Sequence, residues 1–544
     1  MRSWIKSGSP WVWLTSGGVS LALLAVLGLL CLIGWRGLSY FWPAPVYQWQ
    51  LQDDNGAIST LIGERYDREQ VPLETVTEAG INFAVDGDVV ERFLVKTGNR
   101  EYVPLDFRWV WQPQVLSEAA PTSLAVIERR QNGNFYGEIV QLQYNGSRYQ
   151  DDFIGQWLPK AVAYANELVG KAEAMQRHEI GSLNYQLEQL RLARLGEPDS
   201  EQQRQLERQF KALEQQYQQQ ESKLFKLRSQ ASRDHLLVRD MRGELVRINL
   251  ADVVQIHFPN AMSFTDKLKH WGGNVVEFVS AEPREANTEG GVFPAIFGTV
   301  FMVLLMAVVV MPFGVLAAVY LHEYAGKGWL TRFIRIAVIN LAGVPSIVYG
   351  VFGLGFFVYV LGGSIDSLFY SEALPNPTFG TPGVLWSALT LAILTLPVVI
   401  VSTEEGLARI PNSVRHGSLA LGATKAETLW RLVLPMASPA IMTGLILAVA
   451  RAAGEVAPLM LVGVVKLAPQ LPVDGNFPFI HLERKFMHLG FHIYDVGFQS
   501  PNVEAARPLV YATSMLLVTV IVGLNMTAIG VRNHLRRRYR HLDS

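Results

Sequence analysis

The sequence predicts a mainly α-helical, polytopic membrane protein with six transmembrane helices and a separate α+β domain. Three observations support this fold class. Apolar residues are concentrated near the N-terminus and after about Gly291, whereas the stretch between them is polar. Six apolar runs have about the 20 residues that a helix needs to cross a bilayer. Of the 544 residues, 49% are hydrophobic and only 17% are charged.

The six expected transmembrane helices have approximate ends. They are Val12–Trp35, Ala295–Tyr320, Phe333–Leu361, Val384–Ser402, Ala440–Val462 and Leu509–Val531. The first has the position of a signal peptide, but its apolar core is too long and no small-x-small cleavage motif follows it. The sequence "RGLSYFWPAP" that follows is an aromatic belt of the kind found at membrane interfaces. We therefore expect residues 1–45 to form a retained N-terminal anchor.

Lys and Arg residues in the short flanking segments predict the orientation of these helices. They precede the first span, lie between the second and third spans and between the fourth and fifth spans, and follow the sixth. With six crossings these segments share one side, which the positive-inside rule assigns to the cytoplasm. Both termini are therefore expected in the cytoplasm, and residues from about 46 to 287 on the outer side of the membrane.

The expected outer domain, residues 46–287, begins with sequences that favour β-strands. The stretch "GINFAVDGDVVERFLV" predicts a hairpin with a tight turn at Asp86 and Gly87. The stretch "EYVPLDFRWVWQ" follows as a further strand, and "ELVRINLADVVQIHFPN" returns to strand after the helical part. The domain is therefore expected to be α+β.

A polar helical stretch from about 159 to 228 separates these strands. Gly and Pro in "LGEPDS" (Leu195–Ser200) interrupt it, which predicts a helical hairpin. Apolar residues repeat there at a 4/3 spacing that is typical of a coiled-coil seam. They are Leu206, Phe210, Leu213, Tyr217, Leu224 and Leu227. The charged faces of these helices are interpreted as solvated.

Composition and motifs exclude several classes of function. The net charge of -1 gives no argument for a nucleic-acid partner. Cys31 is the single cysteine, so an internal disulfide and a cysteine-based metal site are excluded. The sequence has no G-x-x-x-x-G-K-[ST] loop, no G-x-S-x-G elbow, and no His, Cys or carboxylate residues at metal-binding spacing. We expect neither catalysis by this chain nor a bound metal or cofactor.

The stretch "HGSLALGATKAETLWRLVLP" (His416 to Pro435) lies between the fourth and fifth spans. It predicts a short helix that ends at Gly422 and a second helix with Thr424 as N-cap. Glu427, at the third helical position, would complete a capping box.

The second of these helices is expected to be amphipathic and to end at the prolines at 435 and 439. Its apolar stripe would consist of Leu429, Leu432 and Val433, with Trp430 beside them. Such a stripe either lies on the membrane surface or docks into a groove on a cytoplasmic partner.

Two charged residues lie within the expected fifth span. Arg451 and Glu455 are four residues apart and would share one helical face. A charge near the bilayer centre is costly, so the two form either a structural ion pair or part of a substrate pathway. The planar guanidinium of Arg451 matches a tetrahedral oxyanion bidentately, and Glu455 would hold that group in place.

Small and helix-breaking residues interrupt the third span at "GVPSIVYG". Gly343, Pro345, Ser346 and Gly350 stand where a plain membrane helix would carry Leu. Such residues free backbone groups, which a membrane tolerates only beside protein or a water-filled cavity. They indicate either a packing kink or a pathway.

The fourth span repeats this signal more weakly at Thr395 and Pro397. Glu404 and Glu405 lie at its cytoplasmic end, where they are either gating residues or ordinary solvated charges.

Several motifs in order resemble a known family. Gly422, nine further residues and then Leu432-x-Leu434-Pro435 are similar to the EAA loop of bacterial ABC importer permeases. The stretches "GVPSIVYGVFGL", "STEEGLARIPNSVR", "LALGATKAETLWRLVLP" and "RAAGEVAPLM" resemble the PstA-type permeases of high-affinity phosphate importers. The resemblance covers about Gly291 to the C-terminus. The chain departs from the family at His416-Gly417-Ser418, where the loop usually opens with Glu-Ala-Ala.

The resemblance implies a five-helix ABC permease core at 288–544 with a cytoplasmic coupling loop at 403–438. In that family the loop docks onto a separate ATPase subunit. The implied coupling residues are His416, Gly417, Ser418, Leu421, Gly422, Ala423, Thr424, Leu429, Leu432, Leu434 and Pro435. Charge and spacing supply the pathway candidates, with Glu404 and Glu405 for gating. These candidates are Arg451, Glu455, Gly343, Pro345, Ser346 and Thr395.

The resemblance also implies the partners. They are a PstC-like sister permease, two PstB-like ATPase subunits that use ATP and Mg, and a periplasmic PstS-like phosphate-binding protein. The chain itself would be half of a phosphate pore in the inner membrane. Two rival functions remain open: a membrane-anchored scaffold or signalling protein with an outer coiled coil, and a proton-driven secondary transporter with Glu455 as a relay.

Overall fold

The chain forms two units in the computed structural model. The helical unit comprises Met1–Tyr40, Val292–Asp474 and Pro478–Ser544, and the mixed unit comprises Phe41–Gly291 and Gly475–Phe477. The residues that the structure describes are 9–53, 56–78, 87–103, 105–195, 200–326, 328–500 and 503–539.

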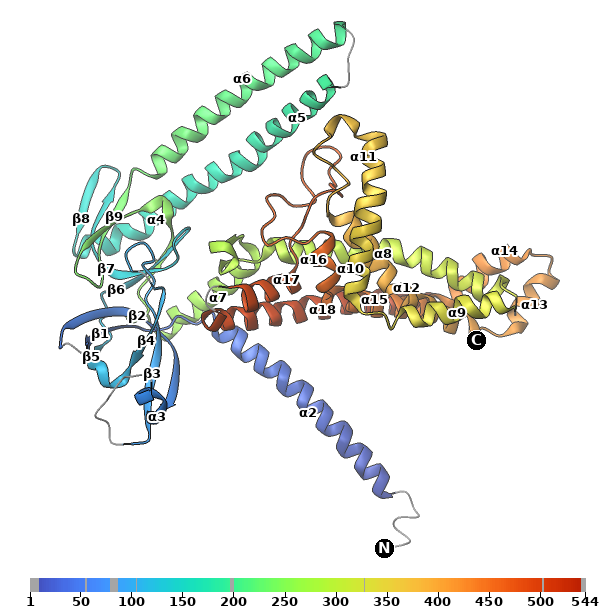
Figure 1. Ribbon diagram of the computed structural model, residues 1–544, viewed down its shortest axis with the longest axis horizontal. Helices are drawn as coiled ribbons and strands as arrows, with labels where there is room; N and C mark the ends of the chain where they lie inside the picture. Colours follow the sequence, from blue (N-terminus) through green and yellow to red (C-terminus); the bar gives the residue numbers. More distant parts are fainter. Residues whose placement is uncertain are drawn as a thin grey trace. The chain divides into compact units, whose positions relative to one another are not determined.

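The mixed unit contains two larger antiparallel sheets within the described residues (Figure 1). The first has the strand order β4-β3-β2-β1-β5. Alternate residues such as Trp49 and Leu51, or Phe93 and Val95, are buried in its core, because successive side chains of a strand point to opposite faces. Its strands are β1 (Val46–Gln52), β2 (Ile58–Pro72), β3 (Val89–Lys96), β4 (Phe107–Trp111) and β5 (Val115–Ala119), and α3 (Leu73–Glu78) follows β2.

The second sheet has the order β10-β9-β7-β6-β11, with β8 paired to β7. Helix α4 (Asp152–Ala174) packs on it through Ile154, Leu158, Ala161 and Ala165, whose spacing places them on one helical face. The strands are β6 (Leu124–Arg129), β7 (Phe135–Tyr144), β8 (Ser147–Gln150), β9 (His235–Arg239), β10 (Leu245–Asn249) and β11 (Val253–His257).

The strands expected from the sequence are described only in part. β4 covers the end of "EYVPLDFRWVWQ", and β10 and β11 lie within "ELVRINLADVVQIHFPN". In the expected hairpin around Asp86 and Gly87, residues 79–86 lie outside the described residues. Its second arm is β3, which pairs with β2 and β4.

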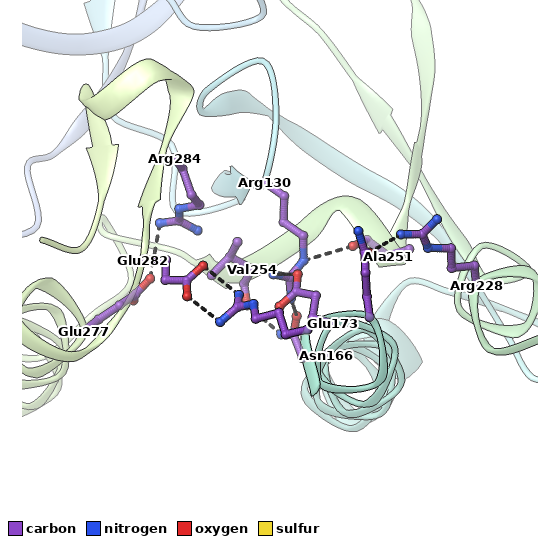
Figure 2. Close-up of polar contacts among 11 residues, drawn as sticks. Arg130, Asn166, Glu173, Arg228, Ala251, Val254, Glu277, Glu282 and Arg284 are labelled. Atoms are coloured by element: carbon purple, nitrogen blue, oxygen red, sulfur yellow. Dashed lines mark hydrogen bonds and ion pairs between the residues drawn. The ribbon is translucent and has the colours of Figure 1, made fainter. Parts of the chain in front are cut away.

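Polar contacts tie α4 to the second sheet (Figure 2). Arg130, which directly follows β6, donates to Asn166 Oδ1 at 2.9 Å and to the carbonyl oxygen of Ala251 at 3.2 Å, and it pairs with Glu173. Asn166 in turn donates to the carbonyl of Val254 at 2.7 Å. Because these contacts reach backbone as well as side chains, they fix the register of α4 on the sheet.

The polar helical stretch forms a long helical pair. After α4, a π-helical turn (Met175–Ile180) leads into α5 (Gly181–Leu195), and α6 (Ser200–Ala231) runs back beside α5 (Figure 1). The residues of the 4/3 repeat are the more buried positions of α6, and Leu224 is almost fully enclosed. A coiled coil in the strict sense stays a prediction. The last elements of the mixed unit are α7 (Phe264–Ser280), β12 (Pro283–Arg284) and β13 (Glu289–Gly290).

Six helices of the helical unit are long and apolar enough to cross a membrane within the described residues. They are Trp11–Ser39, Phe293–Tyr324, Ser346–Phe369, Val384–Ala408, Lys425–Gly454 and Ala506–His534. The elements are α2 (Ser9–Ser39), α8 (Phe293–Val319), α9 (Trp329–Leu341), α10 (Ser346–Phe352), α11 (Gly363–Phe369), α12 (Val384–Ala408), α13 (Asn412–Ala420), α14 (Lys425–Thr428), α15 (Leu434–Gly454), α16 (Ala457–Val462), α17 (Leu489–Tyr494) and α18 (Val503–Tyr539). Their number agrees with the sequence prediction, and the third and fifth spans differ most from their expected bounds.

The expected third span, Phe333–Leu361, is two helices. α9 ends at Leu341, and α10 begins only at Ser346, so the span runs from Ser346 to Phe369. Pro345 is the reason, because it lacks an N–H group and disfavours helical geometry at the residue before it. α9 is a separate amphipathic helix without a fully buried residue.

The expected fifth span, Ala440–Val462, begins and ends earlier than predicted. α14, a π-helical turn (Leu429–Val433) and α15 are continuous from Lys425 to Gly454. Pro435 and Pro439 do not stop the helix. The π turn changes the hydrogen-bond register just before Pro435, where a missing N–H group is then tolerated.

The core of the helical unit lies among α8, α12 and α15. Trp386, Met302 and Ala452 are almost fully buried there. The backbone at Met487 approaches α8 closely at Gly298. A Cβ at this position would overlap the carbonyl oxygen of Met487. This contact seats the segment before α17 against α8.

Gly298→Ala should lower the apparent melting temperature of the purified chain, because overpacking a close backbone contact costs about 1–3 kcal/mol. Differential scanning fluorimetry in detergent measures this. Gly28→Ala is the matched control, since a Cβ at Gly28 has no atom within 4 Å. Equal melting temperatures for the two variants would contradict the packing argument.

Candidate coupling and pathway sites

The segment between α12 and α15 forms two short helices around a glycine turn. Gly422, in the turn after α13, has φ = 89°, a left-handed conformation that other residues rarely adopt. Thr424 caps α14, and its hydroxyl accepts from the backbone N–H of Glu427, while the Glu427 carboxylate accepts from the backbone N–H of Thr424 at 2.9 Å. The capping box expected from the sequence is therefore present. It fixes where the second helix begins.

The apolar face of this segment packs inside the helical unit. Leu429 and Val433 are buried against Leu407 and Ile410, and Leu432 is half-buried. This differs from the expectation of an exposed stripe. α14 continues through the π turn into α15. Leu429 and Val433 therefore pack in the same cluster as Ala437 and Ile441 of α15.

A different apolar surface of the segment is exposed. Leu421, at the turn, is 90% exposed, and Trp430 is 67% exposed. Leu419, near the end of α13, is also exposed. We call these three side chains the coupling knob. They are the apolar groups of this segment that remain available to a partner.

The other expected coupling residues surround the knob. His416 and Gly417 are exposed, whereas Ala423, Leu434 and Pro435 are half-buried. Ser418 contacts Thr428 hydroxyl to hydroxyl at 2.9 Å, which links α13 to α14.

An ion pair fixes α13 to the end of α8. Arg415 donates from Nε and from an Nη to Glu323 Oε1, at 3.1 and 2.9 Å. It also donates to the backbone carbonyls of Leu407 and Ile410, at 2.8 and 2.6 Å. The two charged side chains are only 14% and 10% exposed. Lys425, the first residue of α14, donates to the backbone carbonyl of Glu323 as well.

The gating candidates separate into one paired and one exposed residue. Glu404 accepts from Arg335 of α9 at 3.2 Å, and Arg335 also donates to the carbonyl of Leu321. Glu405 is exposed. Glu404 therefore links α9 to α12.

Arg451 and Glu455 form the expected ion pair in an unexpected setting. Arg451 Nε lies 3.5 Å from Glu455 Oε1. Arg451 is in the last turn of α15, but Glu455 follows the helix end with extended backbone (φ -80°, ψ 131°). The expectation of one shared helical face is therefore wrong. The side chains are 34% and 19% exposed, so a group at the surface of this chain can reach them.

Two helix interruptions meet near this pair. A Cβ at Gly350 of α10 would press against the backbone of Pro458 of α16, which shows how closely the two helices pack. Tyr349 donates a hydrogen bond to the carbonyl of Leu341 at the break between α9 and α10. The positive charge of Arg451 interacts electrostatically with the Tyr349 hydroxyl. The structure thus brings Arg451 to the interrupted third span.

The remaining pathway candidates divide between surface and core. Gly343 and Pro345 are exposed and Ser346 is half-buried, all at the break before α10. Thr395 is fully buried, and its hydroxyl donates to the carbonyl of Leu391 at 2.8 Å within its own helix. Thr395 is therefore a packing residue and does not line an open surface.

Sequence reasoning missed Arg415 and Glu323, because they are far apart in the chain. One signal was present: Glu323 is an acidic residue at the positively charged end of a span. It also missed a loop network after α16, where His481 lies 3.0 Å from Asp474 and 3.2 Å from Glu483, and Arg484 pairs with the same aspartate at 2.7 Å.

Known proteins resemble the helical unit. Residues 310–541 match the family model described as the binding-protein-dependent transport system inner membrane component. The chain is 35% identical over 253 residues to the phosphate transport system permease protein PstA 1 of Mycobacterium tuberculosis (strain ATCC 25618 / H37Rv), covering 46% of this chain and 72% of that protein. It is 33% identical over 257 residues to the PstA protein of Yersinia pestis, covering 47% and 77%.

A solved structure is also similar. It is the MetNI methionine ABC transporter in inward-facing conformations, with 17% identity and a TM-score of 0.32 over 45% of this chain and 94% of that one.

Arg415→Ala should loosen α13 and α14, because it leaves the nearly buried carboxylate of Glu323 unpaired at a cost of about 3–5 kcal/mol. Hydrogen–deuterium exchange of residues 412–428 should become faster. The control is Arg409→Ala, which removes an exposed arginine just before the same segment. Unchanged exchange in Arg415→Ala would show that the pair does not hold the segment.

Proposed function

Because the chain belongs to the family of binding-protein-dependent transport system inner membrane components, the permease subunits of ABC importers, we propose that it forms half of a pathway that imports inorganic phosphate. The pairing of Arg451 and Glu455 at the interrupted helices is the observation that carries this proposal.

The substrate assignment is supported by relatives that match about half of this chain. The proteins from Mycobacterium tuberculosis and Yersinia pestis are named as phosphate transport permeases, and both are more than 30% identical to this chain. The motifs quoted from the helical unit, such as "RAAGEVAPLM", resemble those of PstA-type permeases.

Arg451 has the chemistry that phosphate requires. Its guanidinium offers two parallel donors to a tetrahedral oxyanion. The charge of Arg451 lies where α15 ends, near the contact of α16 with α10. Irregular backbone of this kind occurs at membrane depth only beside a cavity or beside protein. Glu455 would hold the guanidinium of Arg451 while no phosphate is bound and would release it when phosphate arrives.

The proposed assembly contains further subunits. The exposed side of Arg451 would face a PstC-like sister permease, and the chain is 31% identical over 223 residues to the PstC protein of Xylella fastidiosa. Two PstB-like subunits would hydrolyse ATP with Mg, and a PstS-like binding protein would deliver phosphate. The import cycle itself would need no cofactor bound at the coupling or pathway sites of this chain.

The coupling knob would dock into the ATPase. Leu421 and Trp430 expose apolar area, and a helical segment with such anchors suits a groove on a partner. The His416-Gly417-Ser418 opening, which replaces the usual Glu-Ala-Ala, would lie at the edge of this contact. Movement of the groove would then pull on α14.

The chain would cross the bacterial inner membrane six times with both termini in the cytoplasm. This orientation follows from the Lys and Arg residues that flank the spans. The mixed unit, with its helical pair as a coiled coil, would lie in the periplasm.

The function is tested by purifying the chain with its neighbouring subunits and measuring ATP hydrolysis in proteoliposomes. Phosphate presented with the binding protein should stimulate hydrolysis and uptake, whereas sulfate should not. ATP-independent uptake driven by a proton gradient would instead support a secondary transporter. Absence of any co-purifying ATPase would support a scaffold.

Arg451→Ala should reduce phosphate uptake at least about tenfold, because a hydrogen bond to a charged group contributes about 1.5–3 kcal/mol. Arg451→Lys should restore only part of it, since an ammonium lacks the bidentate fork. Arg332→Ala, at an exposed arginine of α9, is the control. Normal uptake by Arg451→Ala in an intact complex would exclude the pathway role.

Leu421→Asp should weaken ATPase attachment, because it places a charge in an apolar contact. Co-purification of the ATPase subunit measures this directly. Phe225→Asp changes a similarly exposed residue of α6 and should have no effect. If the ATPase stays bound to the Leu421 variant with wild-type stoichiometry, the coupling knob is not the docking surface.

A further inference from the structure

Three side chains with metal-binding chemistry meet in the mixed unit, away from the coupling and pathway sites. They are Glu128 of β6, His257 of β11 and His270 of α7. Each offers one donor atom, and these three atoms lie within 4.8 Å of one another. The sequence shows no metal-binding spacing here, because the three residues come from three separate elements.

The fold explains why the three side chains converge. Glu128 is the register partner of Gln255 in the pairing of β6 and β11, and His257 is two residues further along β11. Positions two apart on a strand share a face. α7 lies over that face, since Asn274 accepts from Gln255 at 3.3 Å. His270 is four residues before Asn274 and so lies on the same side of α7.

The site is enclosed and holds an unpartnered donor atom. The side chains of His257 and Glu128 are 10% and 19% exposed. Among the residues that the structure describes, none makes a hydrogen bond with His257 Nδ1. That nitrogen lies 3.9 Å from Glu128 Oε1, too far for a hydrogen bond, and the two imidazole rings lie 4.3 Å apart between centroids.

The protonation states suit a cation. A metal binds imidazole in its neutral form and a carboxylate in its ionised form. The three side chains can supply this combination, and the positive charge of a bound cation would favour it.

We propose that Glu128, His257 and His270 form a binding site for a divalent transition-metal ion of the zinc type. Two imidazoles and one carboxylate are ligands that zinc accepts, and a fourth position stays open for water. Bonds of about 2.0–2.1 Å in a tetrahedron place ligand atoms about 3.3 Å apart. Each donor pair therefore has to close by at most about 1.5 Å. Rotation of the half-exposed His270 side chain would shorten its distances to the other two ligands, and the 3.9 Å between His257 Nδ1 and Glu128 Oε1 has to close by about 0.6 Å.

Outer contacts orient the carboxylate. Gln255 donates to Glu128 Oε1 at 2.8 Å, and Arg284 lies 3.9 Å from Oε2. Arg284 is itself held by Glu277 at 3.2 Å (Figure 2). Such hydrogen-bonded partners are what fixes a metal-binding carboxylate in position. A bound ion would join α7 to both β6 and β11.

The test uses the full chain in detergent, purified with a tag free of histidine and stripped with a chelator. Zinc chloride is added, the protein is desalted, and bound zinc is counted by mass spectrometry. Isothermal titration gives the affinity, and cobalt substituted for zinc should show the visible bands of tetrahedral coordination. The expected result is one ion per chain.

Variants distinguish this site from casual binding. His257→Gln and His270→Gln should each weaken zinc binding at least about 100-fold, because even partners outside the ligand set cost about 10–100-fold. His178→Gln removes an exposed histidine of the same unit and should bind as the wild type does. Circular dichroism verifies that each variant is folded. If the variant of the more enclosed His257 does not fold, His270→Gln alone tests whether the site binds zinc.

Two outcomes would overturn the proposal. One is a wild-type chain that retains no more zinc than His257→Gln does, which would make the two histidines a packed neutral pair. The other is stoichiometric zinc that persists in both histidine variants, which would place the ion elsewhere in the chain.

Discussion

The ion pair of Arg415 and Glu323 is the contact on which the end of the helical unit that carries α13 and α14 depends. Arg415 uses two donors on the carboxylate and further donors on two backbone carbonyls at the end of α12. The π-helical turn that follows α8 (Tyr320–Tyr324), the end of α12 and α13 are therefore joined by one side chain. Both charges are nearly buried, and separating them would leave each without its partner at a high cost in free energy. The two short helices α13 and α14 are therefore fixed to the helical unit.

A second constraint acts inside the membrane, where backbone groups have no water to bond. The break before α10 and the break after α15 each free such groups. The structure brings these regions together through the packing of α10 on α16, with Tyr349 bonded to the carbonyl of Leu341. Arg451 and Glu455 lie beside this meeting point. The two helix breaks and the ion pair of Arg451 and Glu455 thus lie in the same region of the helical unit.

The sequence predicted the features that depend on local composition. Hydropathy gave the number of spans, and the Thr424 capping box followed from residues three apart. Features that depend on distant partners were not predictable. The stripe of Leu429 and Val433 looked exposed because its neighbours, Leu407 and Ile410, lie in and just after α12. Pro435 looked like a helix end because the sequence does not reveal a π turn. Thr395 looked like a pathway residue because its burial depends on α8.

Residues 425 to 454 form one continuous helix, and this has a mechanical consequence. Lys425 and Arg451 are at opposite ends of it, about 40 Å apart at a rise of 1.5 Å per residue. A stiff rod of this length transmits tilt and rotation with little loss. In the proposed transporter, a partner that moved the glycine turn would therefore tilt the whole helix and displace the guanidinium of Arg451 at its far end.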